Sequence, residues 1–124
     1  MAYIKTSRSR HVVAELPQFI RDAEELDLSE EAREAIVNAV SADPLKGDEV
    51  RGSGGVRKVR FAGRGKGKSG GYRVMTAYFG AEIPVYLLAI LSKGDRANFT
   101  AAEIEGFKKL TNEIFHYWRR RRGR

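Results

Sequence analysis

The spacing of apolar residues changes twice along the chain, and this limits the folds that are open to it. Over Pro17–Val40 apolar residues recur every three or four positions, as on the buried side of a helix. Over Val56–Leu91 they alternate with other residues or run together, as in strands. Over Thr100–Trp118 the helical spacing returns. With a short strand predicted at His11–Leu16, the order is β-α-α-β-β-β-α. This predicts an α+β domain, a small antiparallel sheet packed by two N-terminal helices and a C-terminal helix.

Local signals indicate where these elements begin and end. Ser29 is a good N-cap for the second helix, and the Asp43-Pro44 pair ends that helix. Thr100 and Glu103 have the spacing of a capping box at the start of the last helix. The last two strands are expected to form an antiparallel hairpin across a short turn. The later strands are predicted at Val56–Phe61, Tyr72–Phe79 and Val85–Leu91.

The length of 124 residues suits one domain. We expect a basic extension at residues 1–11, a domain at residues 12–118 and a mobile arginine-rich tail at residues 119–124. The chain has no cysteine and only two histidines, so no metal site and no cofactor are expected. The longest apolar run, Ile83–Leu91, is too short for a bilayer-spanning helix, which needs about 20 residues. A signal-peptide pattern is also missing, so the sequence predicts a cytoplasmic protein with no membrane partner.

The charges are strongly segregated along the chain. Residues 12–49 carry eleven acids and three bases, a net charge of −8, whereas residues 50–124 carry seventeen bases and five acids, a net charge of +12. The first eleven residues add +3, so the three segments sum to the formal net charge of +7. Within Arg51–Arg73 there are eight bases and no acid. Self-repulsion in such a segment lowers stability, so it predicts an anionic partner, most commonly nucleic acid. A solvated basic surface is the alternative.

The segment Ala62–Arg73 alternates glycine with lysine and arginine. Gly67-Lys68-Ser69 resembles the end of a P-loop, but Ala62 stands where a P-loop has its first glycine. A strand-like segment follows, instead of the helix whose N-terminus would face the phosphates. We therefore expect no nucleotide partner. A flexible basic loop that only wraps nucleic acid backbones stays open as an interpretation.

Three motifs in a fixed order resemble the HigB branch of the RelE toxin superfamily. They are Gly54–Phe61, Gly65–Arg73 and Val85–Lys93, and the helix opened by Thr100 lies where that family has its C-terminal helix. The resemblance covers residues 12–110. It implies a RelE-like fold and the toxin of a type II toxin–antitoxin system, a ribosome-dependent endoribonuclease that cuts mRNA in the ribosomal A site. It also implies the partners, which are the mRNA, the ribosome and a cognate antitoxin with a helix-turn-helix domain.

Metal-free ribonucleases of this kind use the 2′-hydroxyl group of the RNA as the nucleophile. The protein takes one proton, neutralises the charge that develops on the phosphate and protonates the leaving oxygen. Arginine has a permanent charge and a donor fork that matches phosphate oxygens, whereas lysine can also transfer protons. The resemblance implies four catalytic positions, Lys58, Arg60, Arg73 and Lys93. Further cations are expected to bind RNA, namely Arg57, Arg64, Lys66, Lys68 and Arg96.

The general base is the least determined part of the predicted site. Many members of the family have a tyrosine or a histidine just after the last central strand, whereas Asp95–Thr100 contains neither. Lys58 and Lys93 are therefore the alternatives for proton transfer. Arg73 is the first choice for contact with the scissile phosphate, because it matches the arginine that has this role in the family.

A non-catalytic module that binds RNA or the ribosome is the alternative function. The C-terminal arginines would either grip ribosomal RNA or be solvated charge. Tyr72 would either stack on a base or, as we prefer, pack in the sheet. The acidic helices are expected to face solvent and keep their charge away from RNA. An antitoxin is then expected to cover the basic surface with acids of its own.

Overall fold

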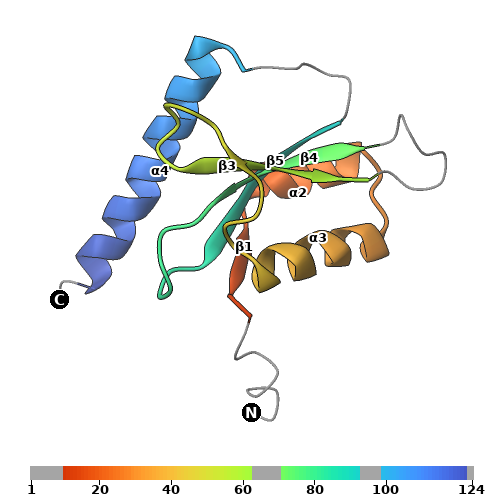
Figure 1. The fold of residues 1–124 in the computed structure, drawn as a ribbon, viewed down its shortest axis with the longest axis horizontal. Coiled ribbons are helices and arrows are strands. Elements are labelled where there is room, and N and C mark those ends of the chain that lie inside the picture. The colour runs from red at the N-terminus through yellow and green to blue at the C-terminus, as the bar shows by residue number, and fades with distance from the viewer. Residues whose placement is uncertain (1–9, 63–70, 93–98, 123–124) are drawn as a thin grey trace, which may run out of the picture.

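The computed structural model describes residues 10–62, 71–92 and 99–122, and within them three helices surround a sheet of five strands (Figure 1). The helices are α2 (Pro17–Glu25), α3 (Glu30–Ala42) and α4 (Ala101–Arg122). The strands are β1 (Val13–Glu15), β2 (Asp48–Glu49), β3 (Val56–Phe61), β4 (Tyr72–Ala77) and β5 (Val85–Ser92). The predicted α+β class is confirmed.

The sheet has the strand order β1-β5-β4-β3-β2 and is mixed. β3, β4 and β5 form the expected antiparallel meander. β1 pairs in parallel with β5, with Val13 beside Val85, so this edge differs from the wholly antiparallel sheet that was expected. The difference comes from connectivity, because two helices separate β1 from the meander and no hairpin turn sets the direction of β1.

β2 is a two-residue strand that the apolar spacing does not indicate. In its register with β3, Asp48 lies opposite Lys58 and Glu49 lies opposite Arg57. Opposite charges that face each other across antiparallel strands stabilise the pairing. Charge complementarity therefore accounts for a strand that carries no hydrophobic pattern.

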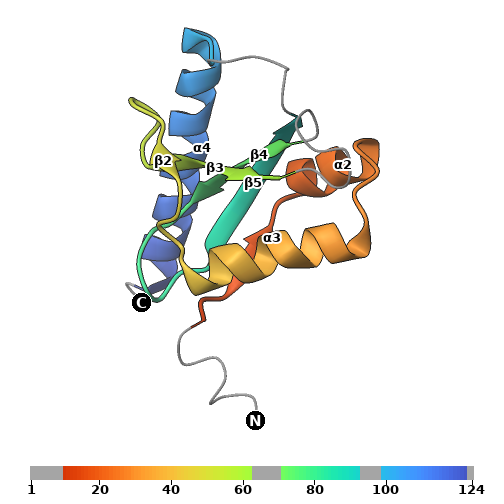
Figure 2. The same cartoon turned by 45° about the vertical axis from the view of Figure 1, so that its right-hand side comes forward.

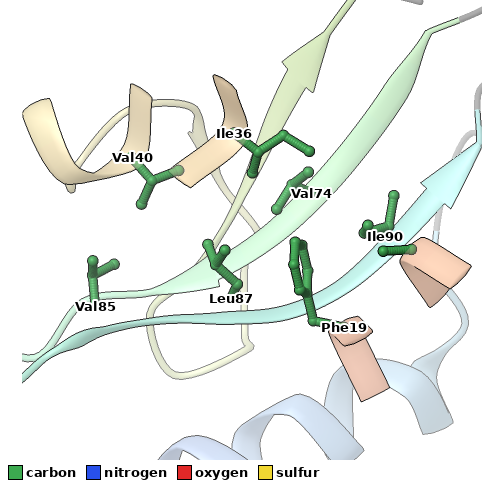
Figure 3. Packing of buried hydrophobic residues seen from close by; sticks show 8 residues of the cluster. Phe19, Ile36, Val40, Val74, Val85, Leu87 and Ile90 are labelled. Carbon is green, nitrogen blue, oxygen red and sulfur yellow. The ribbon is translucent and has the colours of Figure 1, made fainter. Parts of the chain in front are cut away.

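α2 and α3 cover one face of the sheet through a single apolar cluster (Figure 3). Phe19 of α2 and Ile36 and Val40 of α3 meet Val74 and Leu87 of the central strands, and all five are at most 2% exposed. Full burial of a side chain of this kind contributes about 1.5–3 kcal/mol. This cluster fixes both acidic helices to the same side of the sheet.

α4 covers part of the opposite face (Figures 1 and 2). Val56, Met75 and Leu88 form a second buried cluster, against which Phe107 and Leu110 of α4 pack. The sheet thus separates the two N-terminal helices from the C-terminal one. This arrangement decides which charged side chains can act together.

The start of α4 agrees with the sequence prediction, whereas its end lies further along the chain than predicted. The capping box is confirmed, because the Thr100 N–H donates to Glu103 Oε1 (2.9 Å) and the Glu103 N–H donates to the Thr100 hydroxyl oxygen (3.1 Å). The helix continues to Arg122, however, so it extends into the segment expected as a tail after Trp118, and residues 123–124 lie outside the described residues. Arginine forms helices well and positive charge is favourable at a helix C-terminus, so the helix extends beyond its apolar seam. In the described stretches no helix has the length and apolar character needed to cross a membrane.

His11, which lies just before β1, is attached to the rest of the domain by several contacts. Its N–H donates to the Ser41 carbonyl oxygen (2.9 Å), and its Nε2 lies 2.8 Å from the Ile83 carbonyl oxygen. Its ring also packs edge-on against Tyr78. Residues 1–9 lie outside the described residues, so the boundary of the basic extension at residues 1–11 stays a prediction.

Candidate nucleic-acid interface

Two strands bring three of the predicted catalytic cations to one face of the sheet. Successive residues of a strand point to opposite faces, so Lys58 and Arg60 of β3 share a face. In the register with β4, Arg73 lies directly opposite Arg60 and Met75 lies opposite Lys58. Met75 belongs to the cluster that packs against α4, which places all three cations on the α4 side of the sheet. We call Lys58, Arg60 and Arg73 the cationic face.

The arginine pair at the centre of the cationic face is suited to an anion. Directly opposed residues of antiparallel strands have Cβ atoms about 4.5–5.5 Å apart, and like charges there lower the stability of the sheet. Arg60 is exposed and Arg73 is half-buried, so the pair can be reached from solvent. Guanidinium groups in this arrangement can donate bidentate hydrogen bonds to a bound anion.

Lys58 lies against an aromatic ring. Its Nζ is 5.9 Å from the centroid of the Phe99 ring, and Phe99 packs edge-on against Phe107 of α4 with the ring centroids 5.2 Å apart. Because Phe99 directly precedes the N-cap residue Thr100, the start of α4 determines where this ring lies. Sequence reasoning missed Phe99, and the available signal was a large apolar residue next to a capping residue.

A cavity of about 400 Å³ opens between β5, α2 and the first turns of α4. Asp22 at its rim has a structural role, because its Oδ2 accepts a hydrogen bond from the Ile90 N–H (2.9 Å). β1 has ended at this point, so β5 has an unpaired edge that the carboxylate covers. The lining is mostly apolar and comprises Gln18, Asp22, Met75, Ala89, Ile90, Leu91, Phe99, Glu103, Gly106, Phe107 and Leu110.

Arg57, predicted to bind RNA, does not belong to the cationic face. Strand alternation turns it to the opposite side from Lys58 and Arg60. There its guanidinium group donates to the Gly47 carbonyl oxygen (2.9 Å). The structure therefore separates Arg57 from the other cations of β3, and its contact with RNA stays a prediction.

The segments that carry the remaining predicted residues leave the sheet beside the arginine pair. Phe61 pairs with Tyr72, and Tyr72 pairs with Ser92, one position along from Arg60 and Arg73. Residues 63–70 connect β3 to β4, and residues 93–98 follow β5. Five predicted residues belong to these segments and lie outside the described residues, namely Arg64, Lys66, Lys68, Lys93 and Arg96.

The other face of the sheet carries the acidic helices, as expected. Glu30, Glu31 and Glu34 of α3 are all exposed. Tyr72 packs against the cluster beneath these helices, so it faces away from Arg73, and the packing interpretation holds for it. Among the residues that the structure describes, no three acidic or histidine side chains gather in a way that could hold a metal ion.

A family model described as the RelE toxin of the RelE/RelB toxin–antitoxin system matches residues 15–121. The chain belongs to the RelE toxin family. Among solved structures, this RelE-family toxin is similar to a mutant of the E. coli toxin RelE in its free state, in which two arginines are replaced by alanine. The sequence identity is 15% and the TM-score is 0.47, and the match covers 82% of this chain and 97% of that chain.

Membership of this family makes the chain the toxin of a toxin–antitoxin system. Toxins of the RelE family act on mRNA at the ribosome, in general as endoribonucleases, and an antitoxin binds them. The prediction of a RelE-type toxin is confirmed at this level.

Proposed function

We propose that this toxin is a ribosome-dependent endoribonuclease of the HigB-like branch, which cuts mRNA in the ribosomal A site without a metal ion and acts in the cytoplasm. The observation that carries the proposal is the register of β3 and β4, which sets Arg60 opposite Arg73 with Lys58 on the same face. Family membership supports an RNA substrate. Two guanidinium groups in directly opposed positions support a bound phosphate group.

In the proposed reaction the 2′-oxygen of one nucleotide attacks the adjacent phosphorus in line. The P–O2′ bond forms as the P–O5′ bond breaks, which leaves a 2′,3′-cyclic phosphate and a free 5′-hydroxyl group. Arg73 contacts the scissile phosphate and Arg60 binds a second non-bridging oxygen, so both neutralise the charge that develops there. Neither arginine changes its protonation state, because a guanidinium group stays charged at physiological pH.

Two protons move in this reaction, one from the 2′-hydroxyl group and one to the leaving 5′-oxygen. We infer that Lys58 makes one of these transfers. This is supported by the face that Lys58 shares with the arginine pair and by its ammonium group, which lies over the Phe99 ring. Lys93, in the segment that follows β5, is the alternative.

The remaining cations have a binding role in this proposal. The segment between β3 and β4 would hold phosphates on either side of the cut, because glycine next to lysine or arginine lets backbone and side-chain donors approach closely. A helix-turn-helix antitoxin would inhibit the toxin by covering the cationic face with acidic side chains. The residues proposed to bind RNA are Arg57, Arg64, Lys66, Lys68 and Arg96.

The substitution Arg73→Ala tests the catalytic proposal. Cleavage of mRNA on purified ribosomes should fall by about 10²–10³-fold, the usual effect of removing one donor from a developing oxyanion. Co-sedimentation with ribosomes should stay close to that of the unchanged toxin. Arg21→Ala is the matched control, because it removes an exposed arginine from α2, where the side chain contacts Gln18. This control should retain full cleavage.

Mapping the ends of the RNA fragments tests the chemistry separately. The proposal requires a 2′,3′-cyclic phosphate on the upstream fragment, and it requires that a 2′-deoxynucleotide at the cut position blocks cleavage. Fragments with 5′-phosphate ends would contradict attack by the 2′-hydroxyl group. An equal loss of cleavage and ribosome binding in Arg73→Ala would favour the alternative, a non-catalytic module that binds RNA or the ribosome.

A further inference from the structure

The last two turns of α4 carry two pairs of an arginine and an aromatic ring. The guanidinium carbon of Arg119 lies 5.7 Å from the Phe115 ring centroid, and that of Arg121 lies 5.3 Å from the Tyr117 ring centroid. Each pair has the i, i+4 spacing that brings helix side chains together. Both rings are unusually open to solvent for their size, with Phe115 39% and Tyr117 45% exposed.

The two pairs lie on opposite flanks of the helix. Residues two positions apart are separated by about 200° around a helix axis, so Phe115 and Tyr117 point to different sides. Trp118 lies between them and anchors the helix, because its indole N–H donates to the Tyr86 hydroxyl oxygen (2.8 Å). Phe115 also stacks on Phe79, with the ring centroids 6.4 Å apart. Tyr117 packs edge-on against Trp118, with the ring centroids 5.4 Å apart. Both rings are therefore held in place on the domain and are still partly exposed.

Stabilisation of α4 explains only part of this composition. One or two cations in the last turn are enough to interact favourably with the helix dipole, whereas residues 114–124 contain five arginines and no acid. Exposed rings contribute nothing to that interaction, and leaving them in water is unfavourable. Arginine next to an exposed aromatic ring is, however, the combination on which unpaired nucleotide bases stack while their phosphates are neutralised.

We propose that the last two turns of α4 form a second RNA-binding surface, which takes unpaired bases of a folded RNA on Phe115 and Tyr117 and phosphates on Arg119–Arg121. Because the rings lie on two flanks, the helix end would sit between two RNA segments, as in a loop or a bulge. This surface is distinct from the cationic face, since α4 begins beside Lys58 and its end lies about 30 Å further along the helix axis (Figure 1). The inference rests on the proposed function in one respect, namely that the RNA in question is ribosomal.

The fluorescence of Trp118 gives a local test, because it is the one tryptophan of the chain. The probe is a 2′-O-methyl RNA hairpin with an unpaired loop, which attack by a 2′-hydroxyl group cannot cleave. We expect a saturable change in the emission of Trp118. The double substitution Phe115→Leu with Tyr117→Leu keeps apolar bulk but removes both rings. It should weaken binding by about tenfold or more, since stacking contributes about 5- to 150-fold per base in comparable sites.

Two pairs of charge substitutions distinguish binding at this surface from nonspecific electrostatic attraction of RNA to a basic protein. Arg119→Ala with Arg121→Ala should weaken binding strongly, whereas Lys108→Ala with Lys109→Ala removes the same charge from exposed positions of the same helix and should have a much smaller effect. Equal effects of the two double variants would overturn the proposal. So would an equal Trp118 response to inorganic polyphosphate or to a fully paired duplex, since no base would then be stacked.

Two further experiments ask whether the ligand of this surface is RNA or a membrane, and whether binding there depends on the cationic face. Partition into phosphatidylcholine vesicles containing phosphatidylserine, without a response to the hairpin, would overturn the proposal in favour of a membrane surface. The Arg73→Ala variant should give the same Trp118 response as the unchanged toxin. If the unchanged toxin fails to cut mRNA on ribosomes but still shows this response, the proposed function fails and the second surface stands.

Discussion

The hydroxyl group of Thr76, near the end of β4, is buried without a hydrogen-bond partner in the part of the chain that the structure describes. Thr76 is 1% exposed, so its hydroxyl group has lost water and gained no partner in return. Thr76→Val keeps the shape and removes the unsatisfied oxygen, so we expect the free energy of unfolding to rise by about 1 kcal/mol. Urea denaturation followed by circular dichroism measures this change.

Thr111 in α4 is the matched control for that substitution. It is equally buried at 2% exposed, but its hydroxyl group donates to the Lys108 carbonyl oxygen (3.0 Å) and lies 3.4 Å from the Ser53 carbonyl oxygen. Thr111→Val should therefore lower stability, because the one donor that this hydroxyl group offers to the two carbonyl groups is lost. If both valine variants shift the urea midpoint in the same direction, the unsatisfied hydroxyl group is not the cause.

At the scale of secondary-structure elements, α4 packs closely against the loop before β3. Gly54 has φ +82°, and a Cβ atom there would lie 2.6 Å from Thr111 Oγ1, whereas Gly55 has φ +108° and no atom within 4 Å of such a Cβ. Alanine at either position has the cost of a left-handed backbone, about 1–2 kcal/mol. Gly54→Ala also forces α4 away from the loop, so it should be less stable than Gly55→Ala by about 1–3 kcal/mol. Thermal denaturation of the two variants checks this difference, and equal stabilities would contradict the close packing.

The helices and strands also show which parts of the fold could be predicted from the sequence, and why. The caps at Ser29 and Thr100 are local, because each needs only a residue within three positions, and both are present. The direction of β1 and the existence of β2 depend on partners far along the chain, so neither was predictable from local spacing. The end of α4 at Arg122 was missed for a related reason, since the apolar period ends at Trp118 while helix propensity continues.

For the cationic face, periodicity was sufficient to place Lys58 and Arg60 on one side of β3. The partner across the sheet needed the register, which the sequence does not contain, and only the structure sets Arg73 opposite Arg60. For Arg57 the sequence already contained the answer, because strand alternation puts it on the other side of β3 from Lys58. The prediction that Arg57 binds RNA with the other cations did not take this alternation into account. Phe99 was missed because its role depends on a contact between residues 41 positions apart.

At the scale of the whole molecule, the sheet separates the acidic helices α2 and α3 from the cationic face. The acids of α2 and α3 lie over one face, and Lys58, Arg60 and Arg73 lie on the other. Exposed charges that are further apart than the Debye length, about 10 Å at 0.1 M salt, interact little. We therefore expect the acidic helices to lower the net charge of the toxin with little effect on the proposed binding of RNA at the cationic face.

This separation predicts how salt and charge substitutions affect RNA binding. Binding of an uncleavable single-stranded RNA should weaken steeply with salt, with a slope of about −0.7 in log–log terms for each phosphate neutralised. Arg60→Ala with Arg73→Ala should make that slope shallower by about 0.7, because both arginines are proposed to neutralise the same phosphate. Replacing Glu30, Glu31 and Glu34 by glutamine adds +3 to the net charge on the far face and should leave the slope unchanged. Fluorescence anisotropy over a range of KCl concentrations measures both slopes. If the slope changes with net charge in both variants, RNA binding depends on the total charge of the protein, and the cationic face has no special role.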